Sequence, residues 1–332
     1  MSKCPDFDYL LVVPHLRVQN ANAISSPLTH GFPAMSAFIG LMWALERKAK
    51  ATGLDVDFNA VGVVAHGCEE QAASDGFVRG FHLTRNPVGK DGKTAAIAEE
   101  GRIHLDVSLV FAIGCELISD AAEQKAMADK VKLLLESMRI AGGSVVSSHQ
   151  PAWRTQPYMA AFTGDARGRE TIFNQLKMRL LPGFVLTDRQ DALNDEYEAL
   201  RQLNSQATRL DALLSLSRID YAWQPEEDGA DKGEWVATRA SGKKRSGWLV
   251  PIPVGYGALT ELQDAGSVEN ARDNTTPFRF VESLFGIGEW LSPHRLQKPE
   301  QLLWYANTCA DTGTYRCCND YQPTEILESI TD

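Results

Sequence analysis

A dense group of polar side chains lies in the stretch QNANAISSPLTHGFP, residues 19–33, between two apolar segments. Its donors and acceptors are Gln19, Asn20, Asn22, Ser25, Ser26, Thr29 and His30. The prolines and the glycine make turns, but these polar groups exceed what capping one helix requires. Amides can read base edges or sugars, and backbone N–H groups in a turn can receive phosphate. The stretch therefore has two interpretations, a structural turn and a loop that holds a polar ligand.

Two histidines, His15 and His30, flank the polar part of this stretch and could do acid–base chemistry. In an RNA-cleaving enzyme, such a histidine would take the proton of a 2′-hydroxyl group as general base. Hydrogen bonding or packing is the commoner use of a histidine, and no G-x-S-x-G motif indicates a nucleophile. The sequence favours a protein that is not an enzyme, with a metal-independent endoribonuclease that cleaves repeat RNA as the competing hypothesis.

The remaining histidines and cysteines do not have the spacing of a metal site. The seven histidines are scattered, and the six cysteines include no C-x-x-C pair. A disulfide framework is not expected in a chain this large and apolar. We therefore expect no metal and no cofactor.

The stretch NPVGKDGKT, residues 86–94, resembles a phosphate-binding P-loop. Pro87 stands where the first glycine of that motif belongs, and the segment that follows is too short for the required helix. We interpret the stretch as the glycine-rich tip of a hairpin. Arg85, Lys90 and Lys93 give this tip positive charge, so it could contact phosphate.

The charge of the chain is unevenly distributed. Its net charge is −10, which argues against a sequence-blind electrostatic binder of nucleic acid. Residues 139–189 nevertheless hold seven Lys or Arg against three Asp or Glu, whereas residues 190–234 hold four against eleven. Since the acidity is concentrated in one region, other surfaces can be basic and a polyanionic partner is not excluded.

The elements that would position these residues follow a definite order in the first half of the chain. Strands are expected at residues 8–18, 56–66, 102–114 and 144–148, and helices at residues 34–51 and 121–141. The order βαββαβ is that of the ferredoxin-like fold, which many RNA-binding modules share with unrelated proteins.

A long insertion separates the second and third of these strands. Residues 67–101 are too many for a plain turn, so we expect a protruding, thumb-like hairpin. The strand at 102–114 has His104, Asp106 and Ser108 on its polar side, where an RNA-recognition module would have stacking aromatics. Any RNA binding should therefore use loops rather than the sheet face.

The second half of the chain is less regular. Helices are expected around residues 170–180 and 190–218, an acidic loop up to residue 234 and a strand at 247–253. We predict an α+β protein whose ferredoxin-like (RNA-recognition-like) core spans residues 6–149, with the insertion at about 67–101. Residues 150–332 are expected to form a C-terminal α+β extension that packs on this core. No apolar run approaches the roughly 18 residues of a membrane span, and we expect a cytoplasmic protein.

Several long stretches, in order from about residue 8 to residue 306, are similar to one family. They are QNANAISSPLTHGFP, LTRNP, TAAIAEEGRIHL, MRIAGGS, RLLPGF, LDALL, GWLVPIP, NARD, RFVESLFGIGEWLSPHR and LLWY. The chain resembles the second subunit of the Csy complex, which is the type I-F CRISPR surveillance complex. This second subunit is of the Cas-five type. The residues around 224–246 and those after 306 match poorly.

The resemblance implies a non-catalytic, RNA-binding subunit in defence against foreign DNA. Such a subunit holds the 5′ handle of the CRISPR RNA together with the large subunit, and it contacts the adjacent backbone subunit. Target DNA next to the start of the guide is a further candidate partner. In RNA-guided effectors base pairing reads the target, while protein reads the handle and the backbone shape.

The resemblance implies that the polar stretch is a candidate binding site for the 5′ handle of the CRISPR RNA. The expected RNA-binding residues are Gln19, Asn20, Asn22, Ser25, Ser26 and His30 in the 19–30 loop, Arg85 and Lys93 on the insertion, Arg139 at a helix end, and Arg272 in NARD. The aromatic run FRFVESLFGIGEW that follows is expected to form core or a partner interface. A subunit that bridges proteins without touching RNA is a third possibility.

Overall fold

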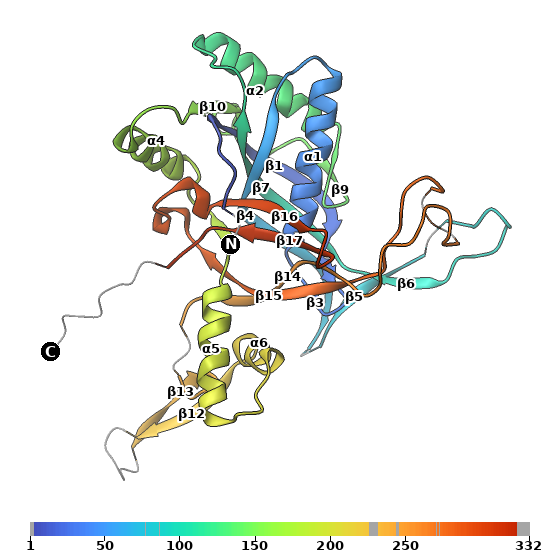
Figure 1. Cartoon of the computed structure of the whole chain (residues 1–332), viewed down its shortest axis with the longest axis vertical. Helices are drawn as coiled ribbons and strands as arrows, with labels where there is room; N and C mark the ends of the chain where they lie inside the picture. The colour runs from blue at the N-terminus through green and yellow to red at the C-terminus, as the bar shows by residue number, and fades with distance from the viewer. Residues whose placement is uncertain are drawn as a thin grey trace.

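The computed structural model describes residues 3–76, 78–85, 87–225, 232–243, 246–269, 271 and 273–323. Within them the chain is mixed α/β, with one large sheet of antiparallel pairs and a few helices (Figure 1). Arg272 lies outside the described residues, as does the acidic segment 226–231.

Four strands from the first half lie side by side in the order β4-β7-β1-β9, and each neighbouring pair is antiparallel. They are β1 (Tyr9–Asn22), β4 (Asp57–Asp75), β7 (Arg102–Gly114) and β9 (Gly143–Val146). Helix α1 (Met35–Ala51) follows β1 and helix α2 (Ala121–Glu136) follows β7. Both helices lie against the same face of the sheet.

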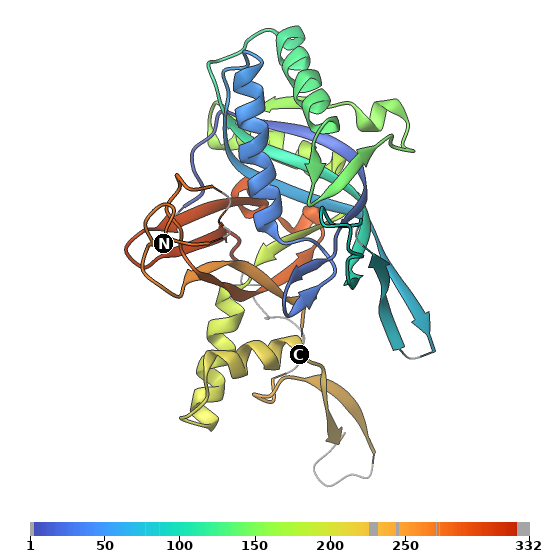
Figure 2. The same cartoon turned by 90° about the vertical axis from the view of Figure 1, so that its right-hand side faces the viewer.

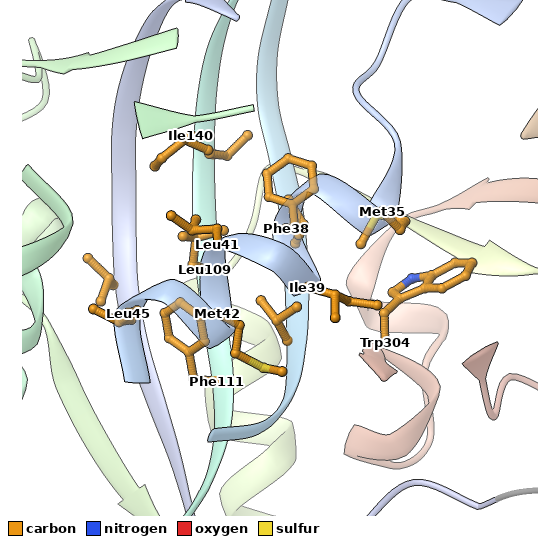
Figure 3. Close-up of a cluster of buried hydrophobic side chains, with 14 of the residues drawn as sticks. Met35, Phe38, Ile39, Leu41, Met42, Leu45, Leu109, Phe111, Ile140 and Trp304 are labelled. Atoms are coloured by element: carbon orange, nitrogen blue, oxygen red, sulfur yellow. The ribbon is translucent and has the colours of Figure 1, made fainter. Parts of the chain in front are cut away.

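Helix α1 forms because its apolar residues recur every three or four positions. Its buried side chains pack between Leu109 and Phe111 of the sheet, Ile140, and Trp304 from the far end of the chain (Figure 3). The Trp304 Nε1–H also donates to the Leu186 carbonyl at 2.8 Å. This cluster therefore joins the two halves of the chain.

The first strand is longer than the sequence predicts. The expected strand ends at residue 18, but β1 continues to Asn22, and its register against β7 shifts twice. His15 and Asn20 adopt positive φ angles of 51° and 56° at these shifts. Because such irregularities break the period-2 pattern, the sequence predicts a loop at the polar end of the strand. The rest of the stretch forms a small hairpin of β2 (Ile24–Ser26) and β3 (Thr29–His30).

The second helix is shorter than the sequence predicts. Helix α2 ends at Glu136, and the chain then forms strand β8 (Arg139–Ile140), which pairs with β9. Ala141 and Gly142 make the connecting turn at φ angles of 47° and 82°. The expectation that Arg139 lies at a helix end is therefore wrong, because the glycines close a hairpin rather than a helix.

The insertion forms an antiparallel hairpin that projects from one end of the sheet (Figure 2). Strand β4 continues to Asp75 and pairs with β5 (Val78–Arg85), which pairs with β6 (Ile97–Glu100). We call residues 71–100 the thumb.

The strands of the second half belong to the same sheet, and the first and the last in their order across it both pair with β4. Their order is β11 (Phe184–Asp188), β15 (Val281–Leu291), β14 (Leu249–Ala258), β17 (Thr314–Asn319) and β16 (Leu303–Cys309). Both ends pair with β4, through Val185 opposite Val64 and Leu303 opposite Gly62. Strand β4 thus belongs both to the first-half strands and to a closed ring.

The remaining elements cover the other sheet face or form a separate lobe. On that face lie α4 (Ala166–Arg179), η1 (Pro293–Arg295) and η2 (Pro299–Gln301). Strand β10 (Tyr158–Ala161) pairs with β1 within the sheet, and α3 (Ala152–Thr155) contacts β1. The lobe contains α5 (Gln190–Leu203), α6 (Arg209–Ser217), β12 (Asp220–Pro225) and β13 (Gly233–Thr238). The helical region expected at 190–218 is thus two helices, and strands flank the acidic segment expected as a loop.

Candidate nucleic-acid interface

Gln19 and Arg139 are brought to the same end of the sheet by strand pairing. Gln19 of β1 lies opposite Ser144 of β9, and Ser144 lies opposite Arg139 of β8. The Arg139 side chain is exposed, and its Nη1 donates to the Gly142 carbonyl at 3.2 Å. An exposed guanidinium and an amide thus lie in one row on β8 and β1, with β9 between them, where both could contact a phosphodiester backbone.

Asn20 is held in place through its backbone. Its N–H donates to His104 Nδ1 of β7 at 3.1 Å, which stabilises the positive φ angle at this position. Asparagine tolerates this conformation better than most residues. Because the backbone makes the anchoring contact, the exposed side-chain amide can face a ligand.

Asn22, Ser25 and Ser26 form bonds within the hairpin. The Asn22 side chain accepts from the Ile24 N–H at 3.1 Å and donates to the Ile24 carbonyl at 2.8 Å. The Ser25 and Ser26 hydroxyls lie 2.8 and 2.7 Å from Thr29 Oγ1, and Ser26 Oγ also accepts from the Thr29 N–H. These three residues therefore shape the loop through their own side chains.

His30 pairs with Ile24 at the open end of this hairpin and lies against the base of the thumb. Its side chain is 60% exposed, its Nδ1 is 4.0 Å from Glu70 Oε1, and its ring centroid is 5.3 Å from that of Phe81. The hairpin and the thumb therefore form one continuous surface.

The two insertion candidates lie further out. Arg85 lies in β5, with its backbone opposite Ile97. Lys93 is exposed near the thumb tip, and its Nζ is 3.6 Å from Asp91 Oδ2. No described contact joins Lys93 to Gln19 or Arg139. The sequence candidates thus form one group at the end of β1 and a second group on the thumb.

A polar cluster that the sequence reasoning only partly identified lies on the sheet face opposite α1. His15 Nδ1 is 3.1 Å from Asp106 Oδ1, and the backbone N–H of His15 donates to Ser108 Oγ at 3.1 Å. Ser108 Oγ is 2.6 Å from His66 Nε2, while His66 Nδ1 is 2.7 Å from the Pro182 carbonyl. The cluster escaped prediction because the four side chains come from three strands whose register was unknown.

The hydrogen bonds of this cluster determine the protonation of His66. A carbonyl can only accept, so Nδ1 carries the proton and Nε2 accepts from the Ser108 hydroxyl. Burial lowers the pKa of His66 below its usual 6.5, which agrees with the neutral ring. Ser108 is 1% exposed, and His66 Nδ1 bonds to the Pro182 carbonyl rather than to a carboxylate. The Ser108–His66 pair therefore does not resemble an activated serine nucleophile with its base.

The described residues contain no group of three or more His, Cys, Asp or Glu that could hold a metal ion. In the same part of the chain, no helix has the length and apolar character needed to span a membrane.

Comparison with known proteins places the chain in a family. The family described as CRISPR-associated protein (Cas_Csy2) matches residues 11–317. The chain belongs to the Cas_Csy2 family. It is 43% identical over 320 residues to the CRISPR-associated protein Csy2 of Pseudomonas aeruginosa strain UCBPP-PA14, covering 94% of this chain and 95% of that relative. The Csy resemblance predicted from the sequence is thereby confirmed at the level of the Csy2 family.

Within this Csy2-family match, the region around β1 is covered from residue 11 onward. The match therefore includes Gln19, Asn20, Arg139 and the thumb.

Proposed function

We propose that this Csy2-family chain is a non-catalytic subunit of the type I-F Csy complex that binds the 5′ handle of the CRISPR RNA together with the large subunit. The observation that carries the proposal is the row of Gln19, Ser144 and Arg139 across three paired strands, beside Asn20. This row presents amides and a guanidinium at one exposed end of the sheet. Such groups bind sugar, phosphate and base edges.

The strand order supports an RNA-recognition-like, Cas-five-type core. In the ferredoxin-like arrangement, the strands of a βαββαβ unit occur in the order 2-3-1-4, with both helices on one face. Strands β4, β7, β1 and β9, with α1 and α2, have this order and this placement. The proposed partners are the large subunit, the adjacent backbone subunit and target DNA near the guide start.

The contacts of the two candidate histidines support a non-catalytic role. His15 is 7% exposed and its Nδ1 lies 3.1 Å from Asp106 Oδ1, so little of its ring is open to a 2′-hydroxyl group. His30 is exposed, but within the described residues it lies against Phe81 and Glu70. We therefore favour a scaffold over a repeat-cleaving endoribonuclease.

Binding of labelled handle RNA to the purified full chain and to its assembled complex tests the proposal. The Gln19→Ala, Arg139→Glu double variant should weaken handle binding by about ten-fold, since it removes one polar contact and reverses one charge. Arg167→Glu, an exposed charge reversal on α4, is the matched control and should bind as the parent does.

Two results would replace the proposal with its alternatives. Metal-independent cleavage of repeat RNA that is abolished by His30→Ala or His15→Ala would show a ribonuclease. Unchanged handle binding in the double variant, with no crosslink between residues 19–30 and the handle in the assembled complex, would indicate a protein-bridging subunit.

A further inference from the structure

A gap in strand pairing opens along one edge of β1. On that edge β1 pairs with β10 through Tyr9–Val12 and with β9 through Arg17–Gln19. Residues 13–16 lie between these two partners, and α3 lies against β1 there. The elements around the gap, α2, β10 and α4, lie together at one end of the molecule (Figure 1).

Two cavities open at this gap, and His15 lines both of them. The first, of about 700 Å³, lies among α2, α3, β10 and the end of α4. The second, of about 590 Å³, lies between β1, α2 and the end of β9 and is lined by Arg17, Lys132, Glu136 and Ser148 among others, with Lys132 Nζ 4.0 Å from Glu136 Oε1. We call the two together the α3 groove. It is large enough for several nucleotides or a short peptide.

The larger cavity is cationic although the chain carries a net charge of −10. Lys125, Arg154 and Arg179 line it, and none of the described residues that line it is acidic. Within the described part of the chain, none of these three side chains forms an ion pair with a carboxylate. A site with three such cations is suited to a polyanion.

The same cavity offers aromatic and apolar surface between the cations. Trp153 is 73% exposed, and the Arg154 guanidinium carbon lies 5.2 Å from its ring centroid. The Arg179 guanidinium carbon lies 4.8 Å from the Tyr158 ring centroid, and Met178 is also exposed in the wall. An exposed indole beside guanidinium groups is a platform on which a nucleobase can stack.

We propose that the α3 groove binds a short segment of single-stranded nucleic acid, with phosphates at Lys125, Arg154 and Arg179 and a base stacked on Trp153. The inference rests on the proposed function, because it extends the path of RNA away from Gln19. Arg17, which lines the second cavity, precedes Gln19 by two positions on β1, and both pair with β9. A strand bound at Gln19 can therefore continue past Arg17 into the larger cavity.

An acidic peptide is the other polyanion that could fit these cations. The continuity of the groove with the Gln19 row favours nucleic acid, since one extended strand can occupy both. The exposed Trp153 favours it too, because every nucleobase has a face that can stack on an indole ring.

The test uses the purified full chain and a labelled oligouridylate of about twelve nucleotides, a length that spans one binding site. The Arg154→Glu, Arg179→Glu double variant should bind this RNA at least about ten-fold more weakly, and the slope of log affinity against log salt should fall by about 0.7 for each lost phosphate contact. Trp153→Ala should weaken binding by about five-fold or more. The control Arg167→Glu, on α4 outside the groove, should leave binding unchanged.

The outcomes separate the groove from the handle site. Loss of binding in the groove variants, with their thermal unfolding unchanged, supports the groove. Unchanged RNA binding in these variants, while Gln19→Ala, Arg139→Glu still weakens handle binding, overturns the groove and keeps the proposed function. Failure of all variants to change RNA binding overturns both. Loss of binding to a labelled polyglutamate peptide, with RNA binding unchanged, would assign the groove to a protein partner.

Discussion

At the scale of single residues, the polar groups of the 19–30 segment divide into those that shape the chain and those that face outward. The Ser26 hydroxyl, on a residue that is 8% exposed, accepts from the Leu28 and Thr29 N–H groups, both at 3.1 Å. The Asn20 amide is exposed, and only its backbone is anchored. Substitutions at the two positions should therefore affect different properties.

Ser26→Ala should destabilise the protein by about 1–3 kcal/mol, because the Leu28 and Thr29 N–H groups both lose their acceptor. Asn20→Gly keeps the positive φ angle and removes only the amide, so it should change stability by less than about 1 kcal/mol. It should weaken handle binding by about two- to twelve-fold, the value of one hydrogen bond. Urea unfolding measures the change in stability, and titration with handle RNA measures the change in binding. A loss of stability in Asn20→Gly with unchanged handle binding would show that Asn20 is structural.

His66 should make stability depend on pH. Its folded pKa is lowered by burial from the usual 6.5, so the unfolded chain takes up the proton more readily. This contribution to stability is complete above the unfolded pKa and is lost as the pH falls through it toward the folded pKa. Urea unfolding between about pH 7.5 and 5.5 should show this loss.

His66→Asn should give a flatter pH dependence than the parent over this range. His294→Gln, at an exposed histidine whose Nδ1 lies 2.8 Å from Ser292 Oγ, should keep the slope of the parent. An unchanged slope in His66→Asn would mean that other groups cause the acid sensitivity.

Single residues could be predicted where their role is visible in the sequence pattern, and not where it depends on contacts made in the folded chain. Gln19, Asn20 and His30 were identifiable because a polar run between apolar segments is visible in the sequence. The His15, His66 and Ser108 network was not, since it depends on strand register and on the Pro182 carbonyl. Which candidates shape the loop was also hidden, because Ser25 and Ser26 differ from Asn20 only in their folded contacts.

At the scale of elements, the β8–β9 hairpin approaches β1 closely at Gly143. A Cβ atom there would lie 2.7 Å from the Gln19 carbonyl oxygen and from the Ala21 nitrogen. Gly143→Val should therefore destabilise the protein by about 1–3 kcal/mol and, by displacing Arg139 from Gln19, weaken handle binding. Gly80→Val in thumb strand β5 has open space around its Cβ position and should be neutral in urea unfolding. Equal effects of the two variants would contradict the close approach.

The lobe of α5, α6, β12 and β13 is held by a buried carboxylate. Glu196 is 0% exposed and accepts from the Ser215 and Ser241 hydroxyls, each at 2.7 Å. Glu196→Ala should remove the acceptor of both hydroxyls at a cost of about 1–3 kcal/mol for each. Hydrogen exchange should then show loss of protection in α5 and α6 while β7 stays protected. Glu198→Ala, exposed on the same helix, should change neither; loss of protection in β7 would mean that the lobe does not unfold separately.

The elements were predictable where their periodicity is uninterrupted. Helix α1 begins and ends within one residue of the expected 34–51, because its apolar stripe is regular. The end of β1 and the β8–β9 hairpin were missed because irregular register and left-handed backbone at Asn20 and Ala141 leave no period-2 pattern to detect.

At the scale of the whole molecule, charge is separated between surfaces. The α3 groove gathers cations in a chain of net charge −10, while the region of residues 190–234 holds eleven acidic residues against four basic ones. An acidic lobe would repel a phosphodiester backbone and would steer it toward the cationic end. This separation makes the net charge of −10 compatible with the proposed RNA-binding groove.

Strand β4 pairs with β7 and also with β11 and β16, so we expect the two halves of the described structure to unfold as one cooperative unit. A Cβ atom at Gly62 would lie 2.6 Å from Leu302 Cγ, so Gly62→Val should force these strands apart at a cost of about 1–3 kcal/mol. Hydrogen exchange should show equal loss of protection in β1 and in β15. Gly67→Ala on the same strand, whose Cβ would meet Asp106 at an ordinary 3.7 Å, is the control. Loss confined to β15 would mean that the halves unfold independently despite the shared strand.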